Sequence, residues 1–301
     1  MKWAFFSNAD YKSLADEIIK DSFYADNSYG GKIAAERRCA ELIVRFVLDL
    51  RVGSPMTLGE VQIKNQIKQL PHHSFLENAI MGLKPKGNES SHTYGIVAAT
   101  EADYERTTES LMNMFAYIFI KYFDKYPFGS KNEVMSSFSL LPPIIRYKTL
   151  EYLYSIDSQN ISVIDKLVLV IMKAKGDEKA KRWVDDHKSD LEKMKVFNDD
   201  AYNKIAENQG IEIAEAMKMF APDNMYRSCM DKIEQLKNTL NDKKLYQTFE
   251  EAFPYYQEHG IIPDDGTDEV QEFNKMMEFL YLGRKSVGEK IEAPFLVLNI
   301  V

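Results

Sequence analysis

The sequence predicts an all-α protein, and two kinds of pattern support this prediction. Apolar residues recur every three or four positions along most of the chain, as in the stripe formed by Ile33, Ala40, Ile43 and Val47, and this is the period of an amphipathic helix. Glycine and proline groups such as the Gly-Ser-Pro turn at 53–55 separate the periodic stretches. An apolar content of 45% and an aromatic content of 12% are sufficient for a packed core.

The first half of the chain predicts helices at 8–24, 31–51, 57–70, 74–83 and 100–126. Thr57 with Glu60, and Thr100 with Asp103, have the spacing of a capping box, in which each side chain bonds to the backbone amide of the other residue. The last of these helices is expected to be central to a bundle, because it has a wide apolar face made by Tyr104, Leu111, Phe115, Ile118, Tyr122, Met112, Met114, Phe119 and Phe123.

The second half predicts a loop or short turn at 131–137 and then helices at 143–155, 160–175, 178–195, 199–221 (despite Gly210), 224–241, 243–258 and 267–283. The β-branched apolar end, 294–301, is expected to be a strand or a tail packed into a groove. We expect two parts, a helical domain over 1–195 and a helical C-terminal region over 196–301, whose role the sequence does not indicate. The boundary between them could instead lie within one long helix, because residues 193–195 can continue it.

Composition excludes several classes of protein. The net charge of −8 argues against a broad nucleic-acid-coating surface, although a small basic groove is compatible with it. Two distant cysteines, Cys39 and Cys229, make neither a disulfide framework nor a zinc site. The longest apolar stretch, 111–120, is too short to span a bilayer, and the N-terminal apolar stretch is too short for a signal peptide. We therefore expect a soluble cytoplasmic protein with no membrane contact.

The segment 86–92 is the strongest candidate for chemistry. It is expected to be a loop in which Gly87 permits a positive φ, so that Lys86, Asn88 and His92 can gather around one hollow. An imidazole titrates near neutral pH and suits proton transfer. The structural alternatives are that His92 fixes the loop by bonding a neighbouring backbone group and that Asn88 caps the loop backbone.

The predicted helix at 31–51 carries the candidate binding residues Arg37, Arg38 and Glu41. Arg37 and Glu41 are four residues apart and share a helix face, which favours a partly buried salt bridge that fixes helix packing. In the functional alternative, the Arg37 side chain points toward the 86–92 loop and binds an anion there. Arg38 is expected to be exposed to solvent.

Other polar groups favour structural roles. His72-His73 is expected in a surface loop, because no cysteine or carboxylate stands at ligand spacing, and the acidic residues at 264–269 predict a turn rather than an EF-hand. Phosphate-loop, dinucleotide, nucleophile-elbow and zinc-protease motifs are absent from the sequence. We therefore expect no metal and no cofactor. The methionines of the last third, including Met217 and Met219, predict core filling or, alternatively, an adaptable partner surface.

Three features in order resemble a known family. They are the stretch 34–43 (Ala-Ala-Glu-Arg-Arg-Cys-Ala-Glu-Leu-Ile), the Gly87-Asn88-x-x-x-His92 segment, and the acidic start of the long apolar helix after Thr100. Together with Thr57-Leu58, they resemble a bacterial domain-of-unknown-function family related to HEPN domains, which is met alone or fused to restriction-enzyme subunits and phage-defence proteins. The resemblance covers about 25–195 and is clearest over 31–125.

The resemblance implies a helical bundle that forms a homodimer. Active HEPN domains are metal-independent RNases that place an Arg-polar-x(4–6)-His motif from each protomer across a shared cleft. Here His92 matches the motif histidine, Asn88 resembles its polar residue, and Lys86 stands where the arginine is expected. That difference weakens the nuclease interpretation, because lysine lacks the planar fork with which arginine binds phosphate. Arg37 or Arg38 could supply the missing guanidinium.

Two functional hypotheses follow. The first is a non-catalytic binding or assembly module of a bacterial or phage-related defence system. It forms a homodimer through its apolar helices and recognises RNA, DNA or a partner protein, the last through its C-terminal helices. The second is a metal-independent endoribonuclease with His92 as general acid or base, helped by Asn88 and Lys86. The first is preferred, because the motif arginine is missing and the chain is acidic.

Overall fold

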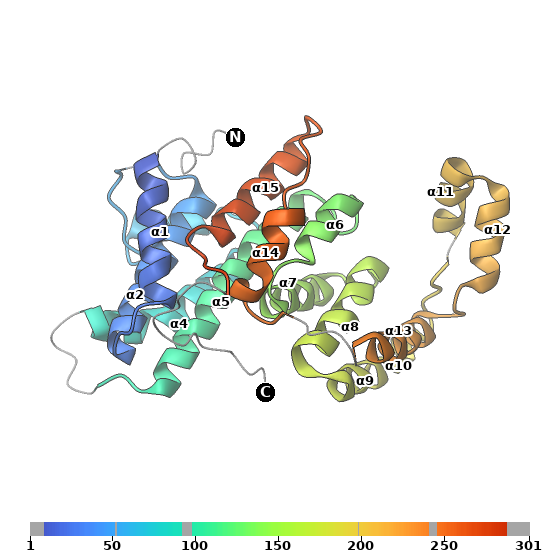
Figure 1. The fold of residues 1–301 in the computed structure, drawn as a ribbon, viewed down its shortest axis with the longest axis horizontal. Coiled ribbons are helices and arrows are strands. Elements are labelled where there is room, and N and C mark those ends of the chain that lie inside the picture. The colour runs from blue at the N-terminus through green and yellow to red at the C-terminus, as the bar shows by residue number, and fades with distance from the viewer. Residues whose placement is uncertain (1–8, 52, 92–97, 198, 241–245, 288–301) are drawn as a thin grey trace. The chain divides into compact units, whose positions relative to one another are not determined.

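A computed structural model describes residues 9–51, 53–91, 98–197, 199–240 and 246–287. These residues form fifteen helices and no strand (Figure 1), which confirms the all-α prediction for this part of the chain. They divide into two compact units. Unit 1 contains the described residues within 1–149 and 246–299, and unit 2 contains those within 150–245.

Unit 1 is built around one long central helix. This helix, α5 (Glu101–Lys125), packs on α2 (Tyr29–Leu48) and α4 (His73–Ser91). A further helix, α1 (Ala9–Phe23), runs beside α2 (Figure 1). The stretch Met114 to Ile120 of α5 is buried on every side, as expected for the centre of a bundle. The remaining helices of the unit are α3 (Val61–Ile67), α6 (Asn132–Phe138), α14 (Phe249–His259), α15 (Asp268–Tyr281) and the first part of α7 (Pro143–Ile156).

Local sequence signals explain where α5 begins and ends. The Thr100 hydroxyl accepts a hydrogen bond from the Asp103 amide, and the Asp103 carboxylate accepts one from the Thr100 amide, so the predicted capping box is present. The helix ends at Lys125, two residues before Pro127, whose ring disfavours helical backbone in the residue before it.

Aromatic contacts attach α15 to α2 and α5. Phe46 of α2 stacks on Phe279 of α15 with ring centroids 4.2 Å apart. Phe119 of α5 lies 6.0 Å from Phe273 of α15. Unit 1 therefore combines the start of the chain with residues 246–287, whereas the sequence predicted a division into 1–195 and 196–301. The predicted boundary differs because this burial joins segments more than 150 positions apart in the sequence, and no local pattern signals it.

Unit 2 contains six helices and the end of α7. The helices α8 (Ile161–Lys175), α9 (Asp177–Asp186) and α13 (Met225–Leu240) pack on one another, with α10 (Lys188–Leu191) beside α9 and α13. Ion pairs between Lys181 and Glu234 (2.5 Å) and between Lys237 and Asp177 (2.8 Å) link α9 to α13. The other two helices, α11 (Asp199–Gln209) and α12 (Ile211–Phe220), pack on each other as a hairpin.

Several element predictions are wrong in detail. The single helix predicted over 199–221 is two helices, because Gly210 adopts a φ of 99°, a left-handed value that interrupts a right-handed helix. The segment 131–137, predicted as a loop or short turn, contains most of α6. The helix predicted from Thr57 begins at Val61, so Thr57 does not cap it. The predicted helix at 178–195 is interrupted at His187, which separates α9 from α10.

Candidate functional site

The predicted loop at 86–92 is largely helical. Residues 86–91 continue α4 to Ser91, so the loop prediction is wrong for this segment. Pro85 lacks the amide hydrogen that would bond to a preceding carbonyl, yet its φ is close to the helical value, and the helix continues past it. The side chains of Lys86 and Asn88, and His92 as a whole, lie outside the described residues. The catalytic role of these three residues stays a prediction.

The predicted binding residues of α2 form ion pairs. Arg37 Nε lies 3.9 Å from Glu41 Oε1, and both side chains are mostly buried. Burial raises the pKa of Glu41, while Arg37 and Arg45 oppose that rise. Arg38 is half exposed, and its guanidinium lies 3.1 Å from Asp21 Oδ2. These contacts match the structural interpretation of the pair and the expected exposure of Arg38.

Glu36, one residue before Arg37, is a buried carboxyl that sequence reasoning missed. It is fully buried and accepts hydrogen bonds from the hydroxyls of Thr107 (2.6 Å) and Thr108 (2.5 Å) of α5. Burial raises its pKa to about 8, although the two hydroxyl bonds oppose the rise. The signal was present in the sequence, since Glu36 lies three residues after Ile33 and four before Ala40, on the apolar stripe of the helix.

A second buried polar cluster, the Arg284 cluster, contains Arg284, Glu250 and Tyr24. Arg284 follows α15, and its guanidinium lies between two phenyl rings, 3.9 Å from the centroid of Phe23 and 4.1 Å from that of Phe249. Its Nη1 is 3.8 Å from Glu250 Oε1, and the Tyr24 hydroxyl donates to the same carboxylate. Nη2 is buried and has no hydrogen-bond partner among the described residues. Burial raises the pKa of Tyr24 to about 12.

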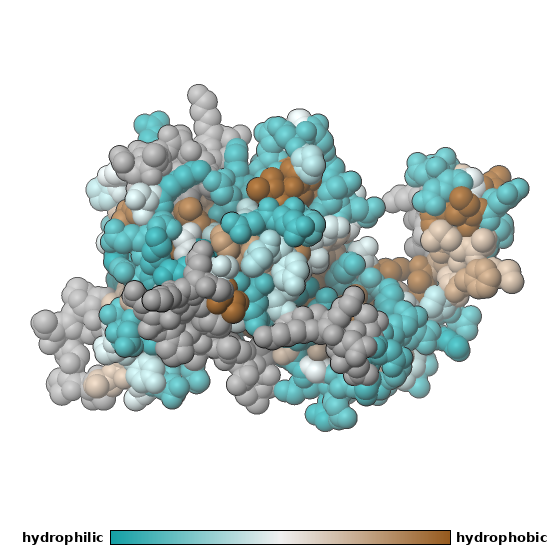
Figure 2. All heavy atoms as spheres, viewed as in Figure 1, coloured by the Kyte–Doolittle hydropathy of each residue, from teal (hydrophilic) through white to brown (hydrophobic). Residues whose placement is uncertain are grey.

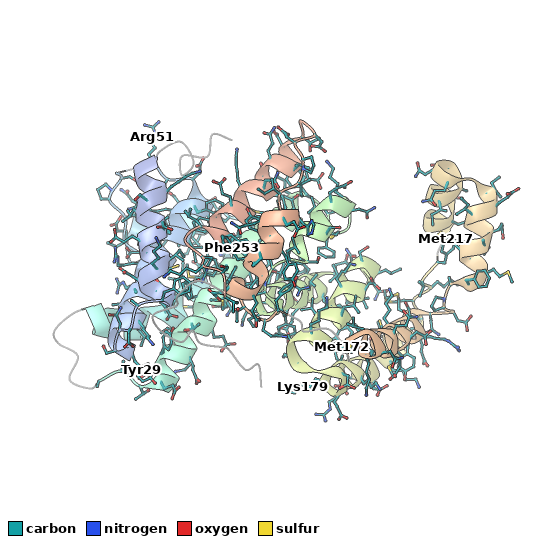
Figure 3. All side chains as sticks on the ribbon, in the orientation of Figure 1. Tyr29, Arg51, Met172, Lys179, Met217 and Phe253 are labelled. Atoms are coloured by element: carbon teal, nitrogen blue, oxygen red, sulfur yellow. The ribbon has the colours of Figure 1, made fainter. Side chains whose placement is uncertain are left out.

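A groove of about 470 Å³ borders the Arg284 cluster. Its aromatic wall comes from Phe253 (labelled in Figure 3), Tyr256 and Tyr281, and the last two rings stack with centroids 4.0 Å apart. Charges of both signs line the rest, from Asp16, Lys20, Glu278, Arg284 and Lys285. The volume is in the range of small-ligand sites, but charges of both signs favour no single class of ligand.

The most exposed apolar surface of the described residues is α12. Phe220 and Met219 are about four-fifths exposed (80% and 79%), while Ile213 and Met217 are about half exposed (45% and 46%). Hydrophobic atoms gather over α11 and α12 in Figure 2, and Met217 is labelled on α12 in Figure 3. We call the set Ile213, Ala216, Met217 and Phe220 the α12 stripe.

The α11 side of the hairpin fixes the orientation of α12. Ala214 is fully buried, the Tyr202 hydroxyl donates to Glu215 Oε1 over 2.7 Å, and Lys218 Nζ lies 5.2 Å from the centroid of the Tyr202 ring. The polar and charged residues Glu215 and Lys218 therefore contact α11. The α12 stripe, which contains no charged residue, lies on another face and stays exposed.

Among the described residues, no group of three or more histidine, cysteine, aspartate or glutamate side chains could hold a metal ion. None of the described helices combines the length and apolarity needed to cross a membrane. No protein-family model, curated protein or solved structure matches the chain.

Proposed function

We propose that this protein is a non-catalytic helical binding and assembly module, and that two copies associate through α12. The observation that supports this proposal is the α12 stripe: Ile213, Ala216, Met217 and Phe220 stand at i, i+3, i+4 and i+7 and face solvent. This spacing places them on one side of a helix, and it is the pattern by which an amphipathic helix packs against a protein surface.

The energetic argument starts from the exposed area. Burying one large apolar side chain completely stabilises a complex by roughly 1.5–3 kcal/mol. Three large side chains of the stripe, Ile213, Met217 and Phe220, are at least 45% exposed. A helix of ten residues is also marginal by itself, so packing a second helix on the stripe stabilises the hairpin as well as the complex.

The stripe is complementary to a second copy of itself. In an antiparallel pair with the twofold axis between Ala216 and Met217, Ile213 of one copy faces Phe220 of the partner subunit. At the centre, Ala216 faces Met217 of the partner subunit. A small side chain thus meets a large one at the centre, and large apolar side chains meet at both ends, which is the alternation that fills a helix interface. Isologous pairing of this kind is the commonest symmetry of soluble oligomers.

The wider context of the proposal comes from the resemblance to HEPN-related proteins. That family implies a homodimer and a role in bacterial or phage-related defence, and we extend the proposal to such a system. The acidic net charge of −8 favours a protein rather than RNA or DNA as the contact of the exposed surface.

Solution mass tests the proposal. The parent protein should show a mass that rises from one chain to two with concentration in light scattering coupled to size-exclusion chromatography. Phe220→Ser should shift this transition to higher concentration. Met81→Ser is the matched control, because Met81 is also exposed (60%) but lies on α4. A parent that stays a single chain at every concentration, or a Phe220→Ser variant that dimerises like the parent, contradicts the proposal.

A further inference from the structure

A small cavity in unit 1 is lined in part by a lysine, Lys121. The cavity has a volume of about 150 Å³ and lies among α2, α5 and α15. Its lining is mostly apolar or aromatic, from Phe46, Val47, Ile118, Tyr122 and Met276, and the remaining lining residues are Lys121, Lys125 and Glu272. It is smaller than the roughly 300–1,000 Å³ of sites for drug-sized ligands, so it suits a molecule of a few heavy atoms.

Lys121 lines this cavity, and its amine is held by a second lining residue, Val47. The Lys121 Nζ donates a hydrogen bond to the Val47 carbonyl over 2.8 Å, near the C-terminal end of α2. An ammonium has three donors, and this bond uses one of them. The contact also caps the end of α2, where cations are favourable. This capping role does not require an open cavity next to Lys121, so it does not explain why the cavity is there.

The surroundings of Lys121 favour the neutral amine more than bulk water does. Burial is the main cause and lowers its pKa, the carboxylates of Glu272 and Asp49 oppose this, and the ammonium of Lys125 adds a smaller lowering. Lys125 is itself bonded to Glu272 Oε1 over 2.7 Å, and that bond raises the pKa of Lys125. Desolvation of a lysine in an apolar site is a known way to favour its neutral, nucleophilic form.

We propose that the cavity binds a small aldehyde or ketone and that Lys121 captures it as an imine. The Nζ lone pair forms a bond to the carbonyl carbon, the carbonyl π electrons move to oxygen, and a proton passes from nitrogen to oxygen. The C–O bond of the carbinolamine then breaks, the hydroxide leaves as water with the remaining proton of the nitrogen, and the nitrogen electrons form the C=N double bond. One amine and one carbonyl compound give one imine and one water, with no oxidant or reductant.

Competition among the lysines of the intact protein tests this inference. The parent is incubated near pH 7 with a limiting amount of propanal and cyanoborohydride, which reduces imines to stable amines, and modified lysines are quantified by peptide mapping. Lys193, whose side chain is 74% exposed, is the internal reference. Lys121 should be alkylated faster than Lys193, because more of its amine is unprotonated near pH 7. The expected excess is roughly tenfold for each unit by which burial lowers the Lys121 pKa from its ordinary value. Equal or slower alkylation of Lys121 overturns the inference.

A cavity-filling variant separates the cavity from the amine. Met276→Phe keeps Lys121 but occupies part of the space beside it, so alkylation of Lys121 should fall to the rate of Lys193 while other lysines are unaffected. Circular dichroism and the melting temperature establish that this variant is folded. A folded Met276→Phe protein that still modifies Lys121 preferentially contradicts a role for the cavity. If the variant does not fold, the competition in the parent decides the question alone.

Discussion

Thr107 of α5 donates a hydrogen bond to the Glu36 carboxyl of α2 over 2.6 Å, in a part of the core where neither side chain reaches water. Thr108 donates to the other oxygen of the same carboxyl. Two neutral hydroxyls satisfy the acceptor oxygens of Glu36 but do not supply the positive charge that an ionised, buried carboxylate needs. Burial therefore keeps the pKa of Glu36 at about 8.

This arrangement predicts how stability depends on pH. In the unfolded chain Glu36 loses its proton near its ordinary pKa of 4.5, whereas in the folded protein it keeps that proton up to about pH 8. Between these values the folded state binds more protons than the unfolded state, so the free energy of unfolding falls as pH rises. The slope from this one group approaches about 1.4 kcal/mol per pH unit.

The variant Glu36→Gln should remove this contribution, because an amide does not ionise and still offers an oxygen to one threonine. Urea unfolding at several pH values between 5 and 9 measures the effect. The variant should gain stability relative to the parent as pH rises through that window. A difference between parent and variant that does not change with pH contradicts the account of Glu36.

The Arg284 cluster predicts a strong coupling between two substitutions. Arg284→Met leaves the buried Glu250 carboxylate without the cation beside it. The free energy of unfolding should fall by about 3–5 kcal/mol. Adding Glu250→Gln removes the charge that was left unpaired, so the double variant should be less destabilised than the sum of the two single variants. A double-mutant cycle by denaturant unfolding measures this coupling. Strictly additive effects would show that the 3.8 Å pair contributes nothing.

The capping box of α5 predicts a local loss of stability. Thr100→Ala removes the hydroxyl that accepts a hydrogen bond from the Asp103 amide. The free energy of unfolding should fall by about 0.5–2 kcal/mol. Thr57→Ala is the matched control. The backbone amide of Thr57, not its hydroxyl, bonds to Glu60, so this variant should unfold within a few tenths of a kcal/mol of the parent. Equal losses from both variants would rule out the cap as the cause.

The proposed non-catalytic role predicts the outcome of an RNA assay. Purified protein incubated with total RNA in EDTA should give no cleavage that depends on His92. The control is His92→Ala, prepared in the same way, because trace nuclease contaminants affect both samples equally. Cleavage by the parent that disappears in His92→Ala would instead support the endoribonuclease alternative.

Local signals in the sequence predicted part of the local structure: the capping box at Thr100 is present, whereas the one predicted at Thr57 does not begin a helix. The start of α5 depends on Thr100 and Asp103, which are only three positions apart. Its central place in the bundle follows from the wide apolar face of this one helix, which the sequence also shows. The break at Gly210 was missed because glycine is tolerated inside helices at a modest cost, and only the tertiary structure shows its φ of 99°. The continuation of α4 past Pro85 was missed for the converse reason, since proline usually ends a helix.

The site was harder to predict than the fold. Glu36 could have been found, because a carboxyl on an apolar stripe is buried when the stripe is. The pairing of Arg284 with Glu250 and Tyr24, and the placement of Lys121 beside Met276, depend on packing between segments far apart in the chain. Helical periodicity reports which face of each helix is buried, but it does not say which other helix covers that face.

The most direct test of the central claim is a photo-cross-link from α12. A benzophenone amino acid replaces Phe220, the purified protein is irradiated, and the products are mapped by mass spectrometry. Self-association through the α12 stripe predicts a covalent dimer in which position 220 of one copy is joined to residues around Ile213 of the partner subunit. Cross-links found only within one chain, or no cross-linked dimer at concentrations where the parent is dimeric, would contradict the claim.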